Sequence, residues 1–270
     1  MINEGAFCPI CEAAGVVDDV SEAAYLRFRV HQSLFKCRVC EHRWKFPLIA
    51  CDKELEDKFE LELGVVRYGV YAANENGSLP SHLASRLSVV GDGKRLLDFG
   101  SGDGTFLSRA IALGVDAWGV DKDVSSVVSK EIRERIKPSL SCYVSDKFDF
   151  VHSNHVLEHV DDPVLILRDL HASLKNGGVL LIEVPNEIVS LSTMMKRLMF
   201  MKSCSATSMY EHQHFFTIKS LSSALYRAGF SELQISTPRR AFGRWRGLFD
   251  FLATLVSRGD VIYSVARKIE

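Results

Sequence analysis

Apolar and polar positions change their period along the chain, and this change predicts its elements. Short apolar runs separate stretches in which apolar residues recur every three or four positions. The short runs predict strands at 95–99, 117–120, 141–144, 148–153, 179–184, 232–237 and 261–267. The stretches between them predict helices at 105–113, 124–137, 163–174 and 218–228. Strands that alternate with helices are typical of a mostly parallel α/β sheet covered on both faces, here over residues 95–270.

Two further helices are predicted before this domain. Within residues 52–73, one helical face carries the apolar residues Leu55, Phe59, Leu63, Val66 and Val70. A polar segment with glycine and proline at 74–80 ends this helix, and a second helix follows at about 81–90. Residues 52–94 therefore form the connection between an N-terminal segment and the α/β domain.

Four cysteines near the N-terminus form two C-x-x-C pairs, Cys8 with Cys11 and Cys37 with Cys40. The residues between the pairs alternate in polarity and are rich in strand formers, which predicts a β-hairpin. Two such knuckles on a hairpin are typical of a zinc ribbon, because four thiolates fill the tetrahedral shell that zinc prefers. We expect residues 1–51 to form this ribbon around a structural Zn²⁺, since so short a segment lacks a sufficient core.

Three glycines at alternate positions follow the strand at 95–99. The turn consists of Gly100, Ser101, Gly102 and Gly104, directly after Asp98 and Phe99. Glycine lets the backbone approach a ligand closely, and ligands of open α/β sheets bind beyond the carboxyl ends of the strands. The spacing differs from the dinucleotide-binding G-x-G-x-x-G pattern. Asp121, followed by Lys122, lies about twenty residues later, where an acid accepts ribose hydroxyls of either an adenosyl group or NAD.

Composition and charge narrow the class of protein. The chain has 270 residues, of which 47% are hydrophobic and 25% are charged, and its formal net charge is −1. This near-neutral charge gives no overall attraction to nucleic acid. Neither a secretory leader nor an apolar run of about 20 residues is present, so we expect a cytoplasmic protein with reduced cysteines.

Two further motifs make a family resemblance specific. Residues 148–163 have the sequence FDFVHSNHVLEHVDDP, and residues 176–186 have the sequence NGGVLLIEVPN. Together with the glycine turn, these motifs resemble class I S-adenosylmethionine-dependent methyltransferases. The resemblance implies a Rossmann-like seven-stranded sheet. It also implies cofactor contacts from Asp98, Gly100, Ser101, Gly102, Gly104, Asp121, Lys122, Asn154 and His155.

The candidate catalytic residues follow from the same resemblance. Glu158 and His159 would line the substrate side of the site, and a further H-x-H-F-F-T run brings His212 and His214. A hydroxyl acceptor loses a proton during methyl transfer, and histidine suits that general-base role. We place the candidate bases in the order His214, His155, His159, His212. Residues 187–217 are predicted to form a lid or insert, and 239–258 a basic amphipathic helix that covers the cleft or lies at a membrane surface.

With the ribbon in front, the whole chain resembles bacterial enzymes of surface-polysaccharide and sugar modification. The expected activity is O-methylation of a sugar or of a polysaccharide or lipid-linked intermediate, in the cytoplasm or peripherally at the inner membrane. Three alternatives remain open: a sugar C-methyltransferase, an RNA methyltransferase that grips RNA with its ribbon, and a cofactor-binding interaction protein. The ribbon is locally basic with interleaved aromatic residues, which is the feature that an RNA grip would use.

Overall fold

The computed structural model describes most of the predicted α/β domain and both cysteine knuckles. The described residues are 7–17, 33–46, 81–125, 127, 129–143, 145, 147–187, 212–238 and 258–269. Three predictions lie outside them: the helix at 52–73, the helix at 239–258 except for its last residue, and most of the lid at 187–217. None of the helices in the described part is long and apolar enough to span a bilayer.

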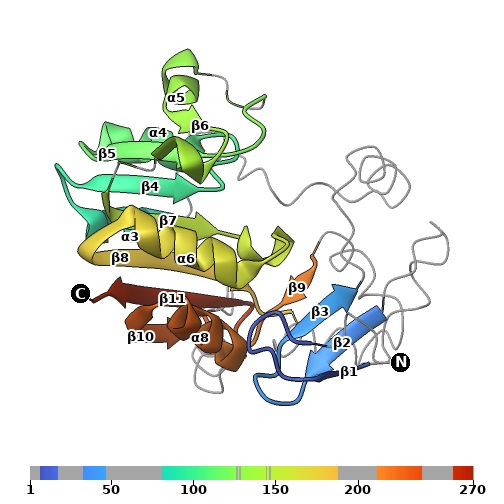
Figure 1. Ribbon diagram of the computed structural model, residues 1–270. Helices are drawn as coiled ribbons and strands as arrows, with labels where there is room; N and C mark the ends of the chain where they lie inside the picture. Colours follow the sequence, from blue (N-terminus) through green and yellow to red (C-terminus); the bar gives the residue numbers. More distant parts are fainter. Residues whose placement is uncertain are drawn as a thin grey trace, which may run out of the picture.

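Seven of the described strands form one mixed sheet in the order β10-β11-β8-β7-β4-β5-β6 (Figure 1). They are β4 (Arg95–Phe99), β5 (Asp116–Val120), β6 (Ile136–Lys137), β7 (Phe148–Asn154), β8 (Leu174–Pro185), β10 (Phe230–Ser236) and β11 (Val261–Lys268). The five strands from β6 to β8 run parallel, and β11 is antiparallel to both of its neighbours. The sheet confirms the predicted Rossmann-like α/β class.

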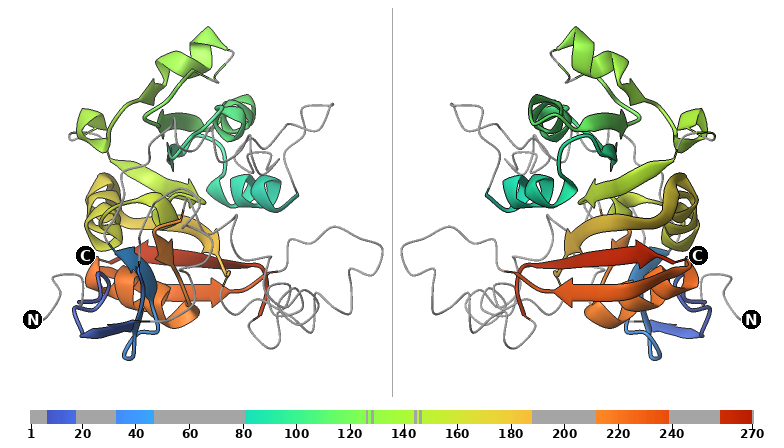
Figure 2. Two further views of the ribbon diagram at one scale, coloured as in Figure 1. Left: turned by 90° about the vertical axis from the view of Figure 1, so that its right-hand side faces the viewer. Right: turned by 90° about the vertical axis from the view of Figure 1, so that its left-hand side faces the viewer.

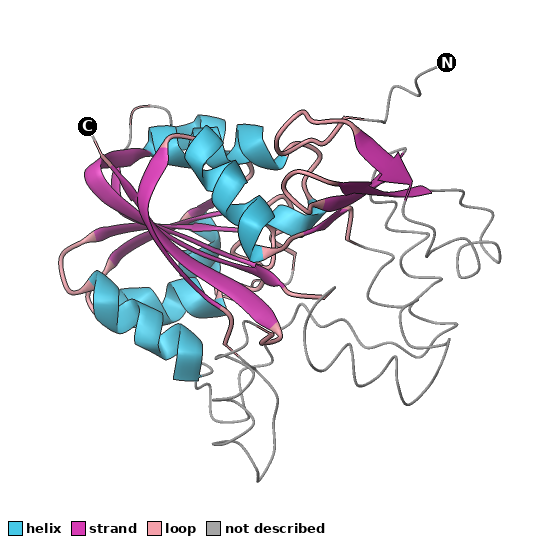
Figure 3. Cartoon of the chain, turned by 90° about the horizontal axis from the view of Figure 1, so that it is seen from below, coloured by secondary structure: helices cyan, strands magenta, loops and turns pink. Residues whose placement is uncertain are grey.

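Helices cover both faces of this sheet (Figure 3). They are α3 (Ser81–Val90), α4 (Thr105–Ala112), α5 (Lys130–Glu134), α6 (Pro163–Ser173) and α8 (Ile218–Arg227). Neighbouring strand residues alternate between two buried clusters: Leu97 packs in the cluster that holds α6 and α8, and Leu96 in the one that holds α3 and α4. A strand buried on both faces needs apolar residues at consecutive positions, which explains the continuous apolar runs of the sequence.

Local capping explains where two of the helices begin. The Asp162 carboxylate accepts from the Leu165 amide at 2.9 Å, and Pro163 takes the first turn of α6, where no amide donor is needed. The hydroxyls of Thr217 and Ser220 form a reciprocal capping box at the start of α8.

The prediction for the third strand was wrong. Residues 140–143 form a 3₁₀ helix, and the strand next to β5 is β6, inside the stretch predicted as a helix. The predicted helix is shortened to α5, because the residues after α5 form hydrogen bonds with the edge of β5. The Gly119 amide donates to the Arg135 carbonyl oxygen at 3.0 Å, and the Asp121 amide donates to the Lys137 carbonyl oxygen at 3.0 Å. Tyr143 then closes the edge by donating to the Gly119 carbonyl oxygen at 3.1 Å.

A second, four-stranded antiparallel sheet surrounds the cysteines in the order β1-β2-β3-β9. Its strands are β1 (Gly15–Val17), β2 (Ser33–Cys37), β3 (Arg43–Phe46) and β9 (His214–Phe215). We call it the ribbon sheet. Figure 2 shows the N-terminal strands beside α8. The fourth strand comes from the far half of the chain, so the ribbon sheet is built from two distant parts of the sequence.

Candidate active site

The glycine turn joins β4 to α4 in a backbone conformation that favours glycine. Gly100, Gly102 and Gly104 have φ values of 81°, 54° and 78°. A Cβ on Gly100 would lie 2.2 Å from the Val156 side chain, so the turn packs tightly against the segment that follows β7. A Cβ on Gly102 would meet no described heavy atom within 4 Å, which leaves this side of the turn accessible to a ligand.

Asp121 holds the turn at the carboxyl end of β5. Its carboxylate accepts from the Gly102 amide at 2.7 Å and from the Asp123 amide at 3.0 Å. Ser101 packs over β5 so closely that a Cβ on Gly119 would lie 2.3 Å from its hydroxyl oxygen. The next residue, Lys122, is exposed. The carboxylate that would accept ribose hydroxyls thus lies beside the open side of the turn.

A buried chain of polar groups runs from Asp98 across the carboxyl ends of the central strands. The Asp98 carboxylate lies 2.7 Å from His152 Nδ1, and Arg86 donates to His152 Nε2 at 2.9 Å. Arg86 also donates to Asn154 at 3.0 Å and to the Glu183 carboxylate at 2.5 Å. Because arginine only donates, His152 Nε2 accepts and its Nδ1 donates to Asp98. Burial raises the pKa of Asp98 and lowers the pKa of His152.

The chain of polar groups continues through His155, directly after β7. His155 has a φ of 54°, and its amide donates to the Glu183 carbonyl oxygen at 3.0 Å. Its Nδ1 lies 3.2 Å from the Glu158 carboxylate and its Nε2 lies 3.5 Å from that of Glu183. Burial lowers the pKa of His155, but the two carboxylates outweigh burial and raise it to about 9. Burial raises the pKa of Glu158, but His155 outweighs burial and lowers it to about 2.

Two more histidines surround Glu158, which is only 1% exposed. His159 Nε2 lies 4.0 Å from the Glu158 carboxylate, and the rings of His159 and His212 are 4.7 Å apart. Glu187 contacts His212 Nδ1 at 2.9 Å and, against the opposing effect of burial, raises its pKa. We call Glu158, His155, His159 and His212 the Glu158 cluster. Ligand atoms of Glu158, His159 and His212 lie within 4.8 Å of one another, so these three residues could hold a metal ion.

His214 contacts the ribbon sheet, whereas His212 contacts Glu187 and the His159 ring. His214 is 1% exposed, belongs to β9, and contacts His42 of the ribbon sheet at 3.1 Å. Burial lowers the pKa of His214 to about 4. The sequence placed His214 first among the candidate bases; the structure places it at the seam with the ribbon sheet, which favours His155 over His214.

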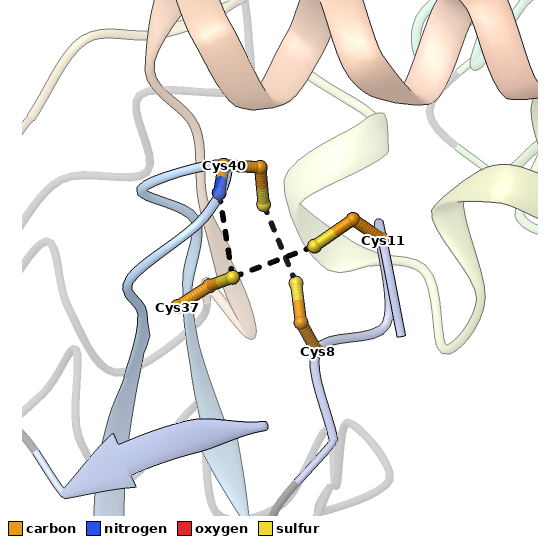
Figure 4. A group of neighbouring side chains, drawn as sticks. All are labelled: Cys8, Cys11, Cys37 and Cys40. Atoms are coloured by element: carbon orange, nitrogen blue, oxygen red, sulfur yellow. Dashed lines mark hydrogen bonds between the residues drawn. The ribbon is translucent and has the colours of Figure 1, made fainter. Parts of the chain in front are cut away.

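The two cysteine pairs meet in one buried cluster with matching knuckles (Figure 4). The Sγ atoms of Cys8 and Cys40 are 3.5 Å apart, and those of Cys11 and Cys37 are 3.4 Å apart. Backbone amides of Ile10, Val39 and Cys40 donate to Sγ atoms, as expected around thiolates. The residues after each pair, Glu12 and Glu41, share a left-handed φ of 62° and 65°. Four thiols at this spacing fit zinc, for which bonds of about 2.3 Å place sulfurs about 3.8 Å apart.

Comparison with known proteins decides the family. Residues 72–235 match the methyltransferase domain family. The chain belongs to this family. Ubiquinone biosynthesis O-methyltransferases are similar to the methyltransferase described here: that of Pseudomonas syringae pv. tomato is 36% identical over 98 residues, which cover 32% of this chain and 42% of that protein. That of Pseudomonas putida is 28% identical over 160 residues, which cover 55% of this chain and 60% of that protein, so the chain spans about half the length of these curated relatives.

Solved structures share the fold of this methyltransferase. A SAM-dependent methyltransferase from Archaeoglobus fulgidus has a TM-score of 0.50 at 18% identity, over 79% of this chain and 99% of that one. A complex of the Haloferax volcanii Trm112 methyltransferase activator with a methyltransferase has a matching chain with a TM-score of 0.51 at 16% identity, over 76% and 100%. The fold is that of S-adenosylmethionine-dependent methyltransferases.

Several residues that shape the site of this methyltransferase were not predicted from the sequence. Arg86 lies in a helix interpreted only as a connection, and Glu183 lies in a strand that carries a family motif but was given no role in the site. Their shared signal is a charge within an apolar element, which needs a buried partner. Glu187 and His42 carried no comparable signal, because their partners are far away in the sequence.

Proposed function

We propose that this methyltransferase transfers a methyl group from S-adenosylmethionine to a hydroxyl group of a small acceptor, with a sugar or lipid-linked sugar as the preferred class. The observation that carries the proposal is the proximity of the Glu158 cluster to the glycine turn. Val156 fills the space that Gly100 leaves open, and Val156 directly follows His155. The candidate base His155 is therefore the direct neighbour in sequence of Val156, the residue that packs on the glycine turn.

The residues around the turn fit S-adenosylmethionine. Gly102 offers an approach without a side chain, and Asp121 offers a carboxylate for the ribose hydroxyls. Asn154 and His155 lie at the carboxyl end of β7, beside the position of the sulfonium in the family that the sequence resembles. The cofactor supplies the activated methyl group, and the protein aligns the acceptor oxygen with it.

His155 is the group that we assign to the acceptor proton. Its Nδ1 has the shorter contact, with Glu158, and Nε2 has the longer one, with Glu183. Nε2 is therefore the nitrogen that an acceptor hydroxyl would reach. Glu158 fixes the orientation of the ring and stabilises the imidazolium formed when the proton arrives. A pKa raised to about 9 makes His155 a strong base once it is deprotonated.

The cysteine cluster is assigned to a structural Zn²⁺ held by Cys8, Cys11, Cys37 and Cys40. Four thiolates leave no open coordination position, so the metal supplies folding energy to the ribbon sheet and no step of the transfer.

The acceptor class is supported by similarity. The curated relatives are named O-methyltransferases, which favours oxygen as the acceptor atom. The cysteine pairs ahead of the methyltransferase motifs resemble sugar-modifying enzymes, which favours a sugar.

The experiment that tests the proposal uses methyl-labelled S-adenosylmethionine with carbohydrate, lipid-linked, quinone-precursor and RNA fractions of cells. Label on oxygen in the carbohydrate or lipid-linked fraction supports the proposal. Label in RNA, on sugar carbon or on a phenol contradicts the preferred acceptor and identifies the alternative. If the protein binds the cofactor but labels no fraction, the result contradicts the proposal and supports the alternative of a non-catalytic, cofactor-binding protein.

A substitution of Asp121 tests the cofactor site. Asp121→Ala removes both the acceptor for ribose hydroxyls and the hydrogen bond to the Gly102 amide. We expect the Kd for S-adenosylmethionine to rise by about 10- to 100-fold, since hydrogen bonds to charged groups contribute about 1.5–3 kcal/mol. Calorimetric titration measures the change. The Lys94→Ala variant is the control, because its exposed side chain lies just before β4, at the end of that strand opposite the glycine turn. An unchanged Kd in Asp121→Ala would place the cofactor elsewhere.

A further inference from the structure

The segment at β9 contacts two structures at once, the ribbon sheet and the Glu158 cluster. On the ribbon side, β9 pairs antiparallel with β3 and places His214 opposite Trp44. The Lys45 amide extends this pairing by donating to the Gln213 carbonyl oxygen at 3.0 Å. In Figure 1, β9 lies between the ribbon strands and the large sheet. The half of the chain that carries the methyltransferase motifs thus completes the sheet of the cysteine domain.

Two buried histidines connect β9 to the second cysteine knuckle. His42 Nε2 lies 3.1 Å from His214 Nδ1, and the two rings stack with centroids 5.3 Å apart. The side chains are 0% and 1% exposed, and the Phe216 ring packs on His42 at 4.9 Å. Each neutral imidazole has one donor and one acceptor nitrogen, so this bond fixes the orientation of both rings.

On its other side, the same segment holds the Glu158 cluster. The Gln213 amide donates to the Glu158 carbonyl oxygen at 2.8 Å. The preceding residue, His212, contacts Glu187 and packs against the His159 ring. A displacement of β9 would therefore move Glu158 and His212 together.

Side-chain hydrogen bonds from Thr217 and Arg227 connect the cysteine knuckles to α8, the helix that follows β9. Thr217 donates to the Cys40 carbonyl oxygen at 3.5 Å. Arg227 of α8 donates to the Ile10 carbonyl oxygen and to the Glu12 carboxylate, both in the first knuckle. The positions of both knuckles and of β9 are therefore coupled.

We propose that His42 is a positioning residue for methyl transfer, which acts through His214 to hold β9 and the Glu158 cluster against the acceptor. The proposal rests on the proposed function, because that function makes the cluster the acceptor side of the site. The ribbon sheet then sets the geometry of the catalytic groups from a distance, without contact with the substrate. A misplacement of reacting groups by about 1 Å can cost about 100-fold in rate.

The test compares two substitutions at position 42 in the full-length, zinc-loaded protein. His42→Phe keeps an aromatic ring but removes the hydrogen bond to His214, whereas His42→Gln places an amide nitrogen near the former Nε2. We expect His42→Phe to lower kcat by about 10- to 100-fold and to raise the acceptor KM. Zinc content and the Kd for S-adenosylmethionine should stay unchanged, and His42→Gln should recover kcat to within about threefold of the wild type.

A matched control separates positioning from general loosening of the ribbon sheet. Phe35 stacks on Trp44 within this sheet, at 5.6 Å, and β2, to which it belongs, does not pair with β9. Phe35→Leu should lower Tm without the loss of kcat. If both variants lose kcat in proportion to Tm, or if His42→Phe keeps its kcat and acceptor KM, the positioning role is refuted.

A readout without catalysis distinguishes this proposal from the proposed function. The His212 ring titration, followed by NMR and assigned with His212→Gln, reports the contact between His212 and Glu187. In His42→Phe, or in zinc-depleted wild type if that variant does not fold, the raised pKa of His212 should fall toward its ordinary value while cofactor binding persists. An unchanged titration overturns the proposal. A shifted titration in a protein that labels no acceptor would support the coupling and contradict the proposed function.

Discussion

His155→Gln is expected to lower kcat by about 10²- to 10⁴-fold at saturating cofactor, the range that a general base contributes. The wild type should show kcat rising about tenfold per pH unit from pH 7 until it levels near 9. The sign follows from the raised pKa of about 9: the imidazolium between Glu158 and Glu183 is unable to accept a proton, and its deprotonated fraction grows with pH until that value is passed. His155→Gln should lose this pH dependence.

Two variants sharpen this experiment. Glu158→Gln removes one of the two carboxylates that raise the pKa of His155, so its pH profile should level at a lower pH. His171→Gln is the matched control, because His171 packs on Phe230 near the amino end of β8 and lies outside the Glu158 cluster. If His155→Gln keeps both the rate and the pH profile of the wild type, the base is another residue of the cluster.

Cys37→Ser is expected to remove the bound zinc and to lower Tm of the whole protein by about 10 °C or more. Structural zinc sites contribute their binding energy to folding, and each kcal/mol shifts Tm by about 2–4 °C in a chain of this size. Because β9 joins the ribbon sheet to the rest, the loss should broaden the main transition rather than melt the ribbon alone. Calorimetry and the zinc-to-protein ratio measure both effects.

Cys142→Ser provides the control for this prediction. Cys142 is an exposed thiol outside the cysteine cluster, so the variant should keep one zinc per chain and the wild-type Tm. A wild-type protein without zinc, or Cys37→Ser with an unchanged Tm, would contradict the structural metal.

The sequence predicted the sheet where local pattern and sheet environment agree. The helices at 163–174 and 218–228 differ from α6 and α8 by one residue, because proline, asparagine and glycine mark their ends. The helix at 81–90 coincides with α3. The prediction of the third strand was wrong because local pattern and sheet environment disagree there. Ile136 and Lys137 continue a helical period, and only the hydrogen bonds with the edge of β5 turn them into a strand.

Only part of the candidate site was named from the sequence, and its pairings were not. The glycine turn with Asp121, and the Glu158–His159 pair, come from contiguous motifs. Two histidines of an H-x-H pair can each face the site. The choice between them depends on the strand with which their segment pairs, which here is β3 of the ribbon sheet. Arg86 and His42 act on partners 97 and 172 residues away, a distance that periodicity does not encode.

The shared sheet also imposes an order on folding during synthesis. In the ribbon sheet, Trp44 of the third strand pairs with His214 of the fourth, which follows 170 residues later. At about 5–20 residues per second, the ribosome leaves β3 an unpaired edge strand for roughly 10–30 s. Unpaired edges invite association with other chains. Until β9 emerges to cover it, this edge of the N-terminal segment stays open to such association.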